Sequence, residues 1–139
     1  ASGLPIGATL LTNKVSEKLF AGCHTNTFGG NPLVCAAGIA TFEHLEKNNL
    51  IEKSSVVGKY FIDELKKIQS PFIREVRGKG LMIAIELKVK ASEYAQVLQD
   101  QGIIVIPTGA NVLRLLPPII FTKENVDEVV PVFRKVFAK

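Results

Sequence analysis

Residues 72–87 read FIREVRGKGLMIAIEL, and this stretch contains two strand-like runs around a glycine-rich segment. Phe72–Val76 and Leu81–Leu87 are rich in the β-branched and aliphatic residues that are typical of strands. The segment Arg77–Gly80 between them offers glycines for a turn and charges that we expect to face water. The sequence therefore predicts a β-hairpin or a close pair of strands at this place.

Three helical patterns accompany the hairpin. The first covers 50–69 and stops before Pro71, the second runs from a Ser92 cap to Gly102, and the third follows a Thr122 cap. The apolar face of the first helix consists of Val57, Phe61, Leu65 and Ile68, and that of the last consists of Val126, Val129, Val130, Phe133, Val136 and Phe137. Each face needs a layer of structure to cover it.

Two more strand patterns complete this part of the chain. Ile103–Ile106 and Val112–Leu116 are apolar runs on either side of a turn at Thr108–Asn111, and Pro117 stops the second run. The patterns over 48–139 therefore predict an α+β fold, in which helices pack on one face of a small sheet.

The region 1–47 has a less self-sufficient pattern. It begins with a strand-like run over 1–11 that has no evident partner, and Thr12 can cap a short helix over 13–20. We therefore expect this region to depend on structure outside itself.

A second helix of this region starts at Asn31, a residue that caps helices well, followed by a proline at the first helical position. It runs to about Glu46. Its first half, Leu33–Ala40, is apolar almost all round, so we expect this half to be buried.

Composition excludes several classes of protein. Hydrophobic residues make up 47% of the 139, which favours a globular chain over a disordered one. The net charge is +4 and lysines are scattered among glutamates, so we expect no basic face for nucleic acid. No apolar run approaches the roughly 20 residues of a membrane span, so we expect no membrane partner.

The cysteines, Cys23 and Cys35, are too few for a secreted disulfide scaffold, and we expect reduced thiols in a cytoplasmic protein. Cys23 lies beside His24, but one Cys–His pair does not make a zinc site, so no metal is predicted. No signal peptide and no initiator methionine are visible, and we expect the chain to be part of a longer one.

Two segments carry residues that could bind an anion. The loop Cys23–Leu33 has hydroxyls, an amide and glycines before a helix N-terminus, which suits a phosphate but also suits a plain helix-capping turn. Arg114 lies between Leu113 and Leu115, which should face the core and leave the arginine exposed on the other face. It is either a solvated cation or, in a cleft, a two-pronged clamp for a carboxylate.

The chain strongly resembles the class III aminotransferases across nearly its whole length. The resemblance rests on collinear motifs at Gly3–Ala8, His24–Leu33, Val76–Met82 and Leu113–Pro118. It implies a small α+β C-terminal domain of a fold-type I enzyme dependent on pyridoxal 5'-phosphate (PLP) over 48–139. It also implies that 1–47 is the end of the large PLP-binding domain with its linking helix.

The resemblance also assigns binding residues. It implies that Thr27, with Asn26 beside it, binds the PLP phosphate by reaching across from the neighbouring subunit of a homodimer. It implies that Arg114 holds the carboxylate of the amino acid or of 2-oxoglutarate. Many relatives have Gly-Ser-Thr where this chain has Thr25-Asn26-Thr27, so the roles of Thr25 and Asn26 stay open.

The family's Schiff-base lysine immediately precedes the motif that begins at Gly3, and no lysine precedes Gly3 in this chain. The resemblance therefore assigns no catalytic residue here, and we expect the chain alone to be inactive.

The likeness is greatest to acetylornithine and ornithine aminotransferases and to enzymes acting on carrier-protected lysine. It implies that the complete protein moves the terminal amino group of such a substrate to 2-oxoglutarate. The motifs also resemble those of 4-aminobutyrate aminotransferase, and a non-catalytic α+β dimerisation module is the alternative from another class. A lysine immediately upstream in the parent protein would separate the enzymes from the module.

Overall fold

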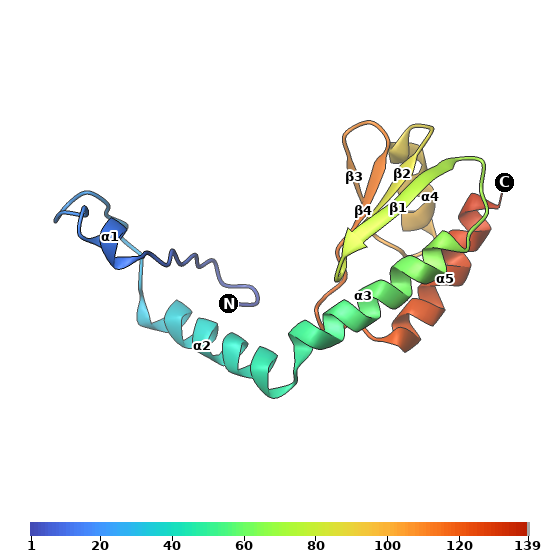
Figure 1. The fold of residues 1–139 in the computed structure, drawn as a ribbon. Coiled ribbons are helices and arrows are strands. Elements are labelled where there is room, and N and C mark those ends of the chain that lie inside the picture. Colours follow the sequence, from blue (N-terminus) through green and yellow to red (C-terminus); the bar gives the residue numbers. More distant parts are fainter. Residues whose placement is uncertain (139) are drawn as a thin grey trace. The chain divides into compact units, whose positions relative to one another are not determined.

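The computed structural model describes residues 1–138, and the chain falls into two compact units. The first unit runs from Ala1 to Asn48, and the second begins at Asn49. Every β-strand of the described residues belongs to the second unit (Figure 1).

The second unit is built on a four-stranded antiparallel sheet with the strand order β1-β2-β4-β3. β1 (Ile73–Lys79) and β2 (Met82–Leu87) form a hairpin, so the predicted strand pair is confirmed. β4 (Val112–Leu115) pairs with β2, and β3 (Ile106–Thr108) pairs with β4.

The turn of the hairpin is shorter than the sequence predicts. The prediction of a turn over Arg77–Gly80 is wrong, because β1 continues to Lys79 and only Gly80 and Leu81 form the turn. Gly80 has φ +54°, in the left-handed region that glycine adopts without strain. Gly78 instead allows a close approach of the strands, since a Cβ there would lie 2.5 Å from the carbonyl oxygen of Met82.

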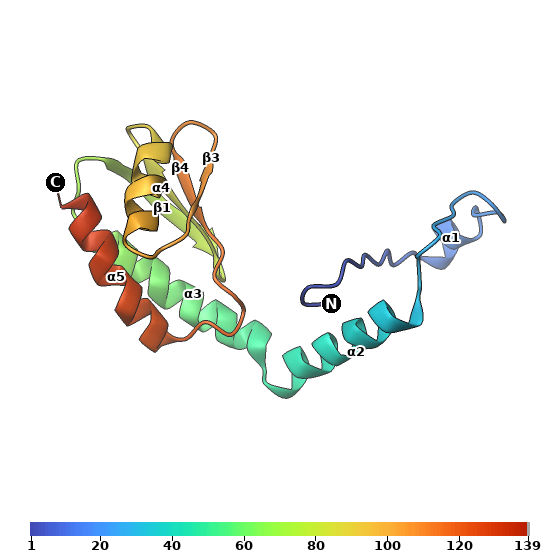
Figure 2. The same ribbon diagram turned by 180° about the vertical axis from the view of Figure 1, so that it is seen from behind.

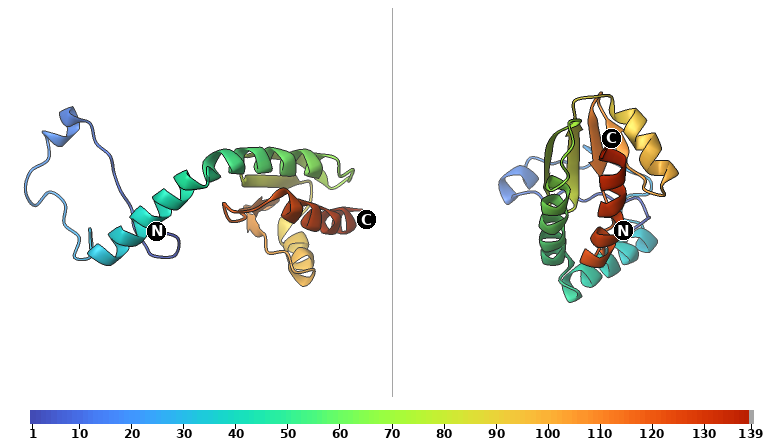
Figure 3. Two further views of the ribbon diagram at one scale, coloured as in Figure 1. Left: turned by 90° about the horizontal axis from the view of Figure 1, so that it is seen from below. Right: turned by 90° about the vertical axis from the view of Figure 1, so that its right-hand side faces the viewer.

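Three helices cover one face of this sheet. α3 (Leu50–Lys66) packs against β1, and α4 (Ala91–Asp100) packs against β3 and β4. α5 (Lys123–Phe137) contacts both other helices. Figure 2 shows α4 in front of the strands, and the right-hand view of Figure 3 shows α5 between α3 and α4. The predicted arrangement of helices on one face is confirmed.

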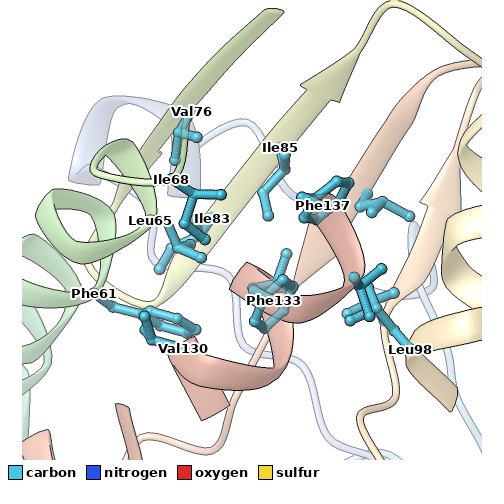
Figure 4. Close-up of a cluster of buried hydrophobic side chains, with 14 of the residues drawn as sticks. Phe61, Leu65, Ile68, Val76, Ile83, Ile85, Leu98, Val130, Phe133 and Phe137 are labelled. Carbon is cyan, nitrogen blue, oxygen red and sulfur yellow. The ribbon is translucent and has the colours of Figure 1, made fainter. Parts of the chain in front are cut away.

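Side-chain alternation explains why only one face is covered. The strand residues buried under the helices are Val76, Ile83, Ile85, Leu87, Leu113 and Leu115. The helices contribute Phe61, Leu65, Leu98, Val130, Phe133 and Phe137 to the same core (Figure 4). The predicted apolar faces of the first and last helices of this unit are thus confirmed, except that Val129 is only half-buried.

The helix caps of this unit follow the sequence in part. Thr122 caps α5 as predicted, since its hydroxyl oxygen accepts the backbone N–H of Asn125 at 3.3 Å. The prediction of a Ser92 cap is wrong, because α4 already begins at Ala91. Ala91 is fully buried, and its N–H donates to the carbonyl oxygen of Ala110 at 3.0 Å, so the N-cap is Lys90, two residues before Ser92.

The strand predicted at Ile103–Ile106 lies further along the chain, at Ile106–Thr108. The reason is that the chain is still completing the end of α4 at Ile103, whose N–H donates to the carbonyl oxygen of Leu98 at 2.9 Å. Gly102, with φ +84°, makes this helix end possible, as predicted.

The first unit contains α1 (Asn13–Ser16) and α2 (Pro32–Lys47). Asn31 caps α2 as predicted, since its Oδ1 accepts the N–H of Val34 at 3.1 Å. The predicted strand over 1–11 is wrong, because no second strand is available among the described residues of this unit to complete its hydrogen bonds.

α1 is shorter than the predicted helix over 13–20, and the side chain of Thr12 makes no capping hydrogen bond. A helix of one turn gains few hydrogen bonds for the backbone freedom that it loses. The sequence pattern therefore overestimates helix in this segment.

The expectation that Leu33–Ala40 is buried is wrong for this chain. Leu33 is 72% exposed and Ile39 is 61% exposed. Gly38, which lies against Ile6, is the only buried residue of the described first unit. The reason is that this unit has no sheet or second layer to cover its apolar helix.

Candidate functional site

The face of the sheet opposite the helices carries the predicted carboxylate-binding residue. We call this the open face, and its residues are Glu75, Arg77, Lys79, Met82, Ala84, Glu86, Ile106, Thr108, Val112 and Arg114. Arg77 pairs with Ala84 across β1 and β2, and Ala84 pairs with Arg114 across β2 and β4. A small alanine therefore separates two arginines on neighbouring strands.

Arg114 is held in place by its leucine neighbours. Leu113 is fully buried and Leu115 nearly so, as predicted, and this alternation points the arginine to the open face. The expectation that Arg114 is an ordinary exposed cation is wrong, because the residue is half-buried and lines hollows on the surface of the unit.

The guanidinium of Arg114 has no hydrogen-bond or ion-pair partner among residues 1–138, and its Nε is buried without one. A buried donor without a partner costs free energy that an incoming acceptor can recover. A carboxylate is the acceptor whose geometry matches the guanidinium fork. Arg114 can therefore bind an anion on the open face.

A network of ion pairs lies beside Arg114 and was not expected from the sequence. Arg77 donates to Oε2 of Glu86 at 2.7 Å and to Oε2 of Glu75 at 2.9 Å, and Arg74 donates to Oε1 of Glu86 at 2.9 Å. The bonds from Arg77 and then Arg74 hold the pKa of Glu86 below its usual value. The period-2 patterns of β1 and β2, which place Arg77 and Glu86 on the same face as Ala84, are the signal that could have revealed the pair of Arg77 with Glu86.

The loop before α2 is stabilised by its own side chains. Oδ1 of Asn26 accepts the N–H of Phe28 at 3.0 Å, and the Asn31 side-chain amide donates to the carbonyl oxygen of Phe28 at 2.9 Å. Asn26 thus serves as a turn residue in this loop. The side chain of Thr27 is exposed and has no hydrogen-bond partner among residues 1–138, so its hydroxyl is available to a ligand.

The first unit brings this loop close to the N-terminal segment. Pro5, Ile6 and Gly7 line one hollow together with Asn26 and the glycines that follow Phe28. Two of the motifs quoted from the sequence therefore meet within this unit. Thr27 and Arg114 lie in different units, and each is described only within its own unit.

The cysteines do not form part of a site of their own. Cys23 is exposed, Cys35 is half-buried, and both are free thiols. Residues 1–138 contain no group of three or more side chains that could hold a metal ion. No helix in this part of the chain has the length and apolar character needed to cross a membrane.

Comparison with known proteins identifies the family. The family model described as aminotransferase class-III matches residues 1–137. The chain belongs to the class III aminotransferases. Among its relatives in this family, the ornithine aminotransferase of Staphylococcus carnosus is 44% identical over 135 residues, which cover 97% of this chain and 34% of the relative. The LysW-aminoadipate semialdehyde transaminase of Deinococcus radiodurans is 42% identical over 137 residues, covering 98% of this chain and 32% of the relative.

Solved structures of class III aminotransferases of the ornithine and acetylornithine type share the fold. An ornithine delta-aminotransferase of Plasmodium falciparum superposes with a TM-score of 0.88 at 34% identity, over 93% of this chain and 35% of the other. The acetylornithine aminotransferase of Elizabethkingia anophelis gives 0.87 at 32% identity, over 93% and 34% of the two chains. The helices and small antiparallel sheet thus match part of a fold-type I aminotransferase, and the chain spans about a third of the length of these relatives.

Proposed function

We propose that the complete protein containing this chain is a PLP-dependent aminotransferase that works as a cytoplasmic homodimer. It transfers the terminal amino group of ornithine, N-acetylornithine or carrier-protected lysine to 2-oxoglutarate. In this proposal, residues 1–47 end the large PLP-binding domain, and residues 48–139 form the small C-terminal domain.

The observation that carries the proposal is the state of Arg114 in a chain of this family. Arg114 is half-buried and directed to the open face, and its Nε is buried without a hydrogen-bond partner among residues 1–138. Every substrate in the proposal carries a carboxylate, which accepts two parallel hydrogen bonds from a guanidinium group. Arg114 therefore binds and orients the substrate by its carboxylate.

The second anchor in the proposal is Thr27. Its exposed hydroxyl can donate to a phosphate oxygen, while Asn26 shapes the turn that presents it. PLP, when bound, supplies the electron sink of the reaction. In this proposal Thr27 reaches across to the cofactor phosphate of the neighbouring subunit, and Arg114 holds the carboxylate of the substrate. Fixed placement of cofactor and substrate is what lowers the entropic barrier.

The experiment that tests the proposal is Arg114→Lys in the complete protein. Lysine keeps the charge but cannot form the two-pronged bond, and loss of one charge-assisted bond costs about 1.5–3 kcal/mol. We expect kcat/KM for 2-oxoglutarate to fall roughly 10- to 100-fold, with cofactor binding unchanged. The matched control is Arg134→Lys, which should leave kcat/KM unchanged. Arg134 is exposed and pairs with Glu64 between α5 and α3, away from the open face.

Two further arms complete this experiment. Thr27→Ala should weaken PLP binding roughly tenfold or more, whereas replacing another exposed threonine of the first unit, in Thr12→Ala, should not. Ornithine, N-acetylornithine, carrier-bound lysine and 4-aminobutyrate should be compared as amino donors, with the 139-residue chain as an inactive reference. Wild-type kcat/KM for both donor and acceptor in Arg114→Lys would refute the assignment of Arg114.

A further inference from the structure

We infer that Arg77 is a positioning residue for the carboxylate site, because it holds Glu86 and so keeps this carboxylate from neutralising Arg114. This inference rests on the proposed function, in which Arg114 binds the carboxylate of the substrate. The role given to Arg77 requires no contact with the substrate.

Glu86 lies within reach of Arg114 on the open face. Ala84 is directly opposite Arg114, and Glu86 is two residues along β2 from Ala84, opposite Val112. Diagonal neighbours of this kind are about 7–8 Å apart at the backbone, a distance that a glutamate and an arginine side chain bridge easily. Glu86 and Arg114 can therefore form an ion pair on the open face.

The structure shows Glu86 engaged elsewhere. Arg77 occupies its Oε2 at 2.7 Å, and Arg74 occupies its Oε1 at 2.9 Å. Arg74 reaches Glu86 because a register shift of β1 between Ile73 and Glu75 changes the spacing of the strand there. The pKa of Glu86 is held below its usual value by these two bonds, so the carboxylate is charged at neutral pH.

The consequence of losing Arg77 follows from this geometry. One oxygen of Glu86 is then free, and Arg114 is a cation without a partner on the same face. A substrate carboxylate must displace Glu86 before it can bind, so the apparent affinity is the intrinsic affinity multiplied by the fraction of molecules in which Arg114 is still unpaired. If the internal pair forms in about 70–90% of molecules, affinity for the substrate falls roughly three- to tenfold.

The first test uses steady-state kinetics of the complete enzyme. Arg77→Met keeps an apolar stem and removes the charge, and we expect KM for 2-oxoglutarate to rise roughly three- to tenfold with little change in kcat. Arg74→Met together with Arg77→Met should raise KM further, because both oxygens of Glu86 are then free. Adding Glu86→Gln to Arg77→Met should return KM to the wild-type value. The control is Arg134→Met, which breaks the ion pair with Glu64 and should leave KM unchanged.

The variant that combines Arg77→Met with Glu86→Gln distinguishes the possible roles of Arg77. If Arg77 contacted the substrate directly, or only stabilised the sheet, Glu86→Gln would not rescue KM, and the inference would be overturned. An unchanged KM in the variant that lacks both Arg74 and Arg77 would overturn it as well.

The second test follows Glu86 in the 139-residue chain by NMR titration of its carboxyl group. Without Arg74 and Arg77, the pKa of Glu86 should stay below its usual value because Arg114 becomes its partner. It should become normal only when Arg114 is also replaced by methionine. A normal pKa while Arg114 is present would show that the two groups do not meet, and this result does not depend on enzymatic activity. Failure of wild-type turnover would instead refute the proposed function.

Discussion

Phe133 and Phe28 are the same residue type in one chain, yet Phe133 is fully buried and Phe28 is 79% exposed. The same difference in burial separates the two units in which these residues lie. From Leu50 onward the apolar residues of helices and strands converge on one core, whereas Gly38 is the only buried residue of the described first unit. Apolar composition alone therefore does not create a core, because a covering layer of secondary structure is also needed.

The largest expected difference between the units comes from deleting a phenylalanine ring. Phe133→Ala should lower the free energy of unfolding by about 3–5 kcal/mol, because it leaves a cavity in the core of the second unit. Phe28→Ala should change it by less than about 0.5 kcal/mol, as for other exposed positions. Urea unfolding followed by circular dichroism measures both. Equal losses in the two variants would mean that the first unit has a core of its own.

A smaller effect is expected from adding one methyl group. A Cβ at Gly58 in α3 would lie 2.0 Å from the carbonyl oxygen of Gly80, so Gly58→Ala forces the helix and the hairpin apart. Overpacking of this kind costs about 1–3 kcal/mol, which exceeds the gain in helix propensity. Gly7→Ala in the first unit meets nothing within 4 Å and should be neutral. Thermal unfolding of both variants gives the comparison, and a neutral Gly58→Ala would contradict the tight contact.

The two threonines at helix N-cap positions, Thr122 and Thr12, provide a third comparison. Thr122 accepts a backbone hydrogen bond in its capping box, whereas Thr12 makes no side-chain capping bond. Thr122→Ala should therefore destabilise the second unit by about 0.5–2 kcal/mol, and Thr12→Ala should have no measurable effect. Chemical denaturation of the two variants under identical conditions checks this. A cost for Thr12→Ala similar to that for Thr122→Ala would indicate a cap that the structure does not show.

The smallest expected effect is a loss of stability of the second unit at alkaline pH. Tyr60 of α3 donates to Oδ1 of Asp127 in α5 at 2.6 Å, and this bond raises the pKa of the phenol from 10.0 to about 12. The folded state favours the protonated phenol, so its contribution is complete below pH 10.0 and is lost as the pH rises towards about 12. Tyr60→Phe should remove this part of the pH dependence, as measured by unfolding midpoints across the same range. An identical pH profile in wild type and Tyr60→Phe would refute the link.

The sequence predicts the second unit well because its patterns are mutually consistent. The apolar face at Val57, Phe61 and Leu65, the Thr122 cap and the hairpin are all local signals that the core then satisfies. The strand predicted at 1–11 fails for the opposite reason, because a strand is completed by a partner that the local sequence does not contain.

The candidate site on the open face was likewise predictable where local pattern decides and not where a partner strand decides. The alternation of Leu113, Arg114 and Leu115 predicts which way the arginine points, and the structure bears this out. The pairing of Glu86 with Arg74 could not be predicted from the sequence, because it depends on a register shift in β1 that no residue pattern predicts. Local periodicity thus places a residue on a face but does not choose its partner across the strands.

The strand order has a consequence for how this sheet behaves at high protein concentration. β1 and β3 are the two edges, and an unpaired edge strand is a template on which further chains can add. β3 is three residues long and contains Pro107, while β1 has an irregular register and charges at Arg74, Glu75, Arg77 and Lys79. Both features oppose the addition of a fifth strand from another molecule. We therefore expect resistance to fibril formation to reside in these two edges, and replacing Arg74, Glu75 and Lys79 with threonine should shorten the lag time in a thioflavin assay.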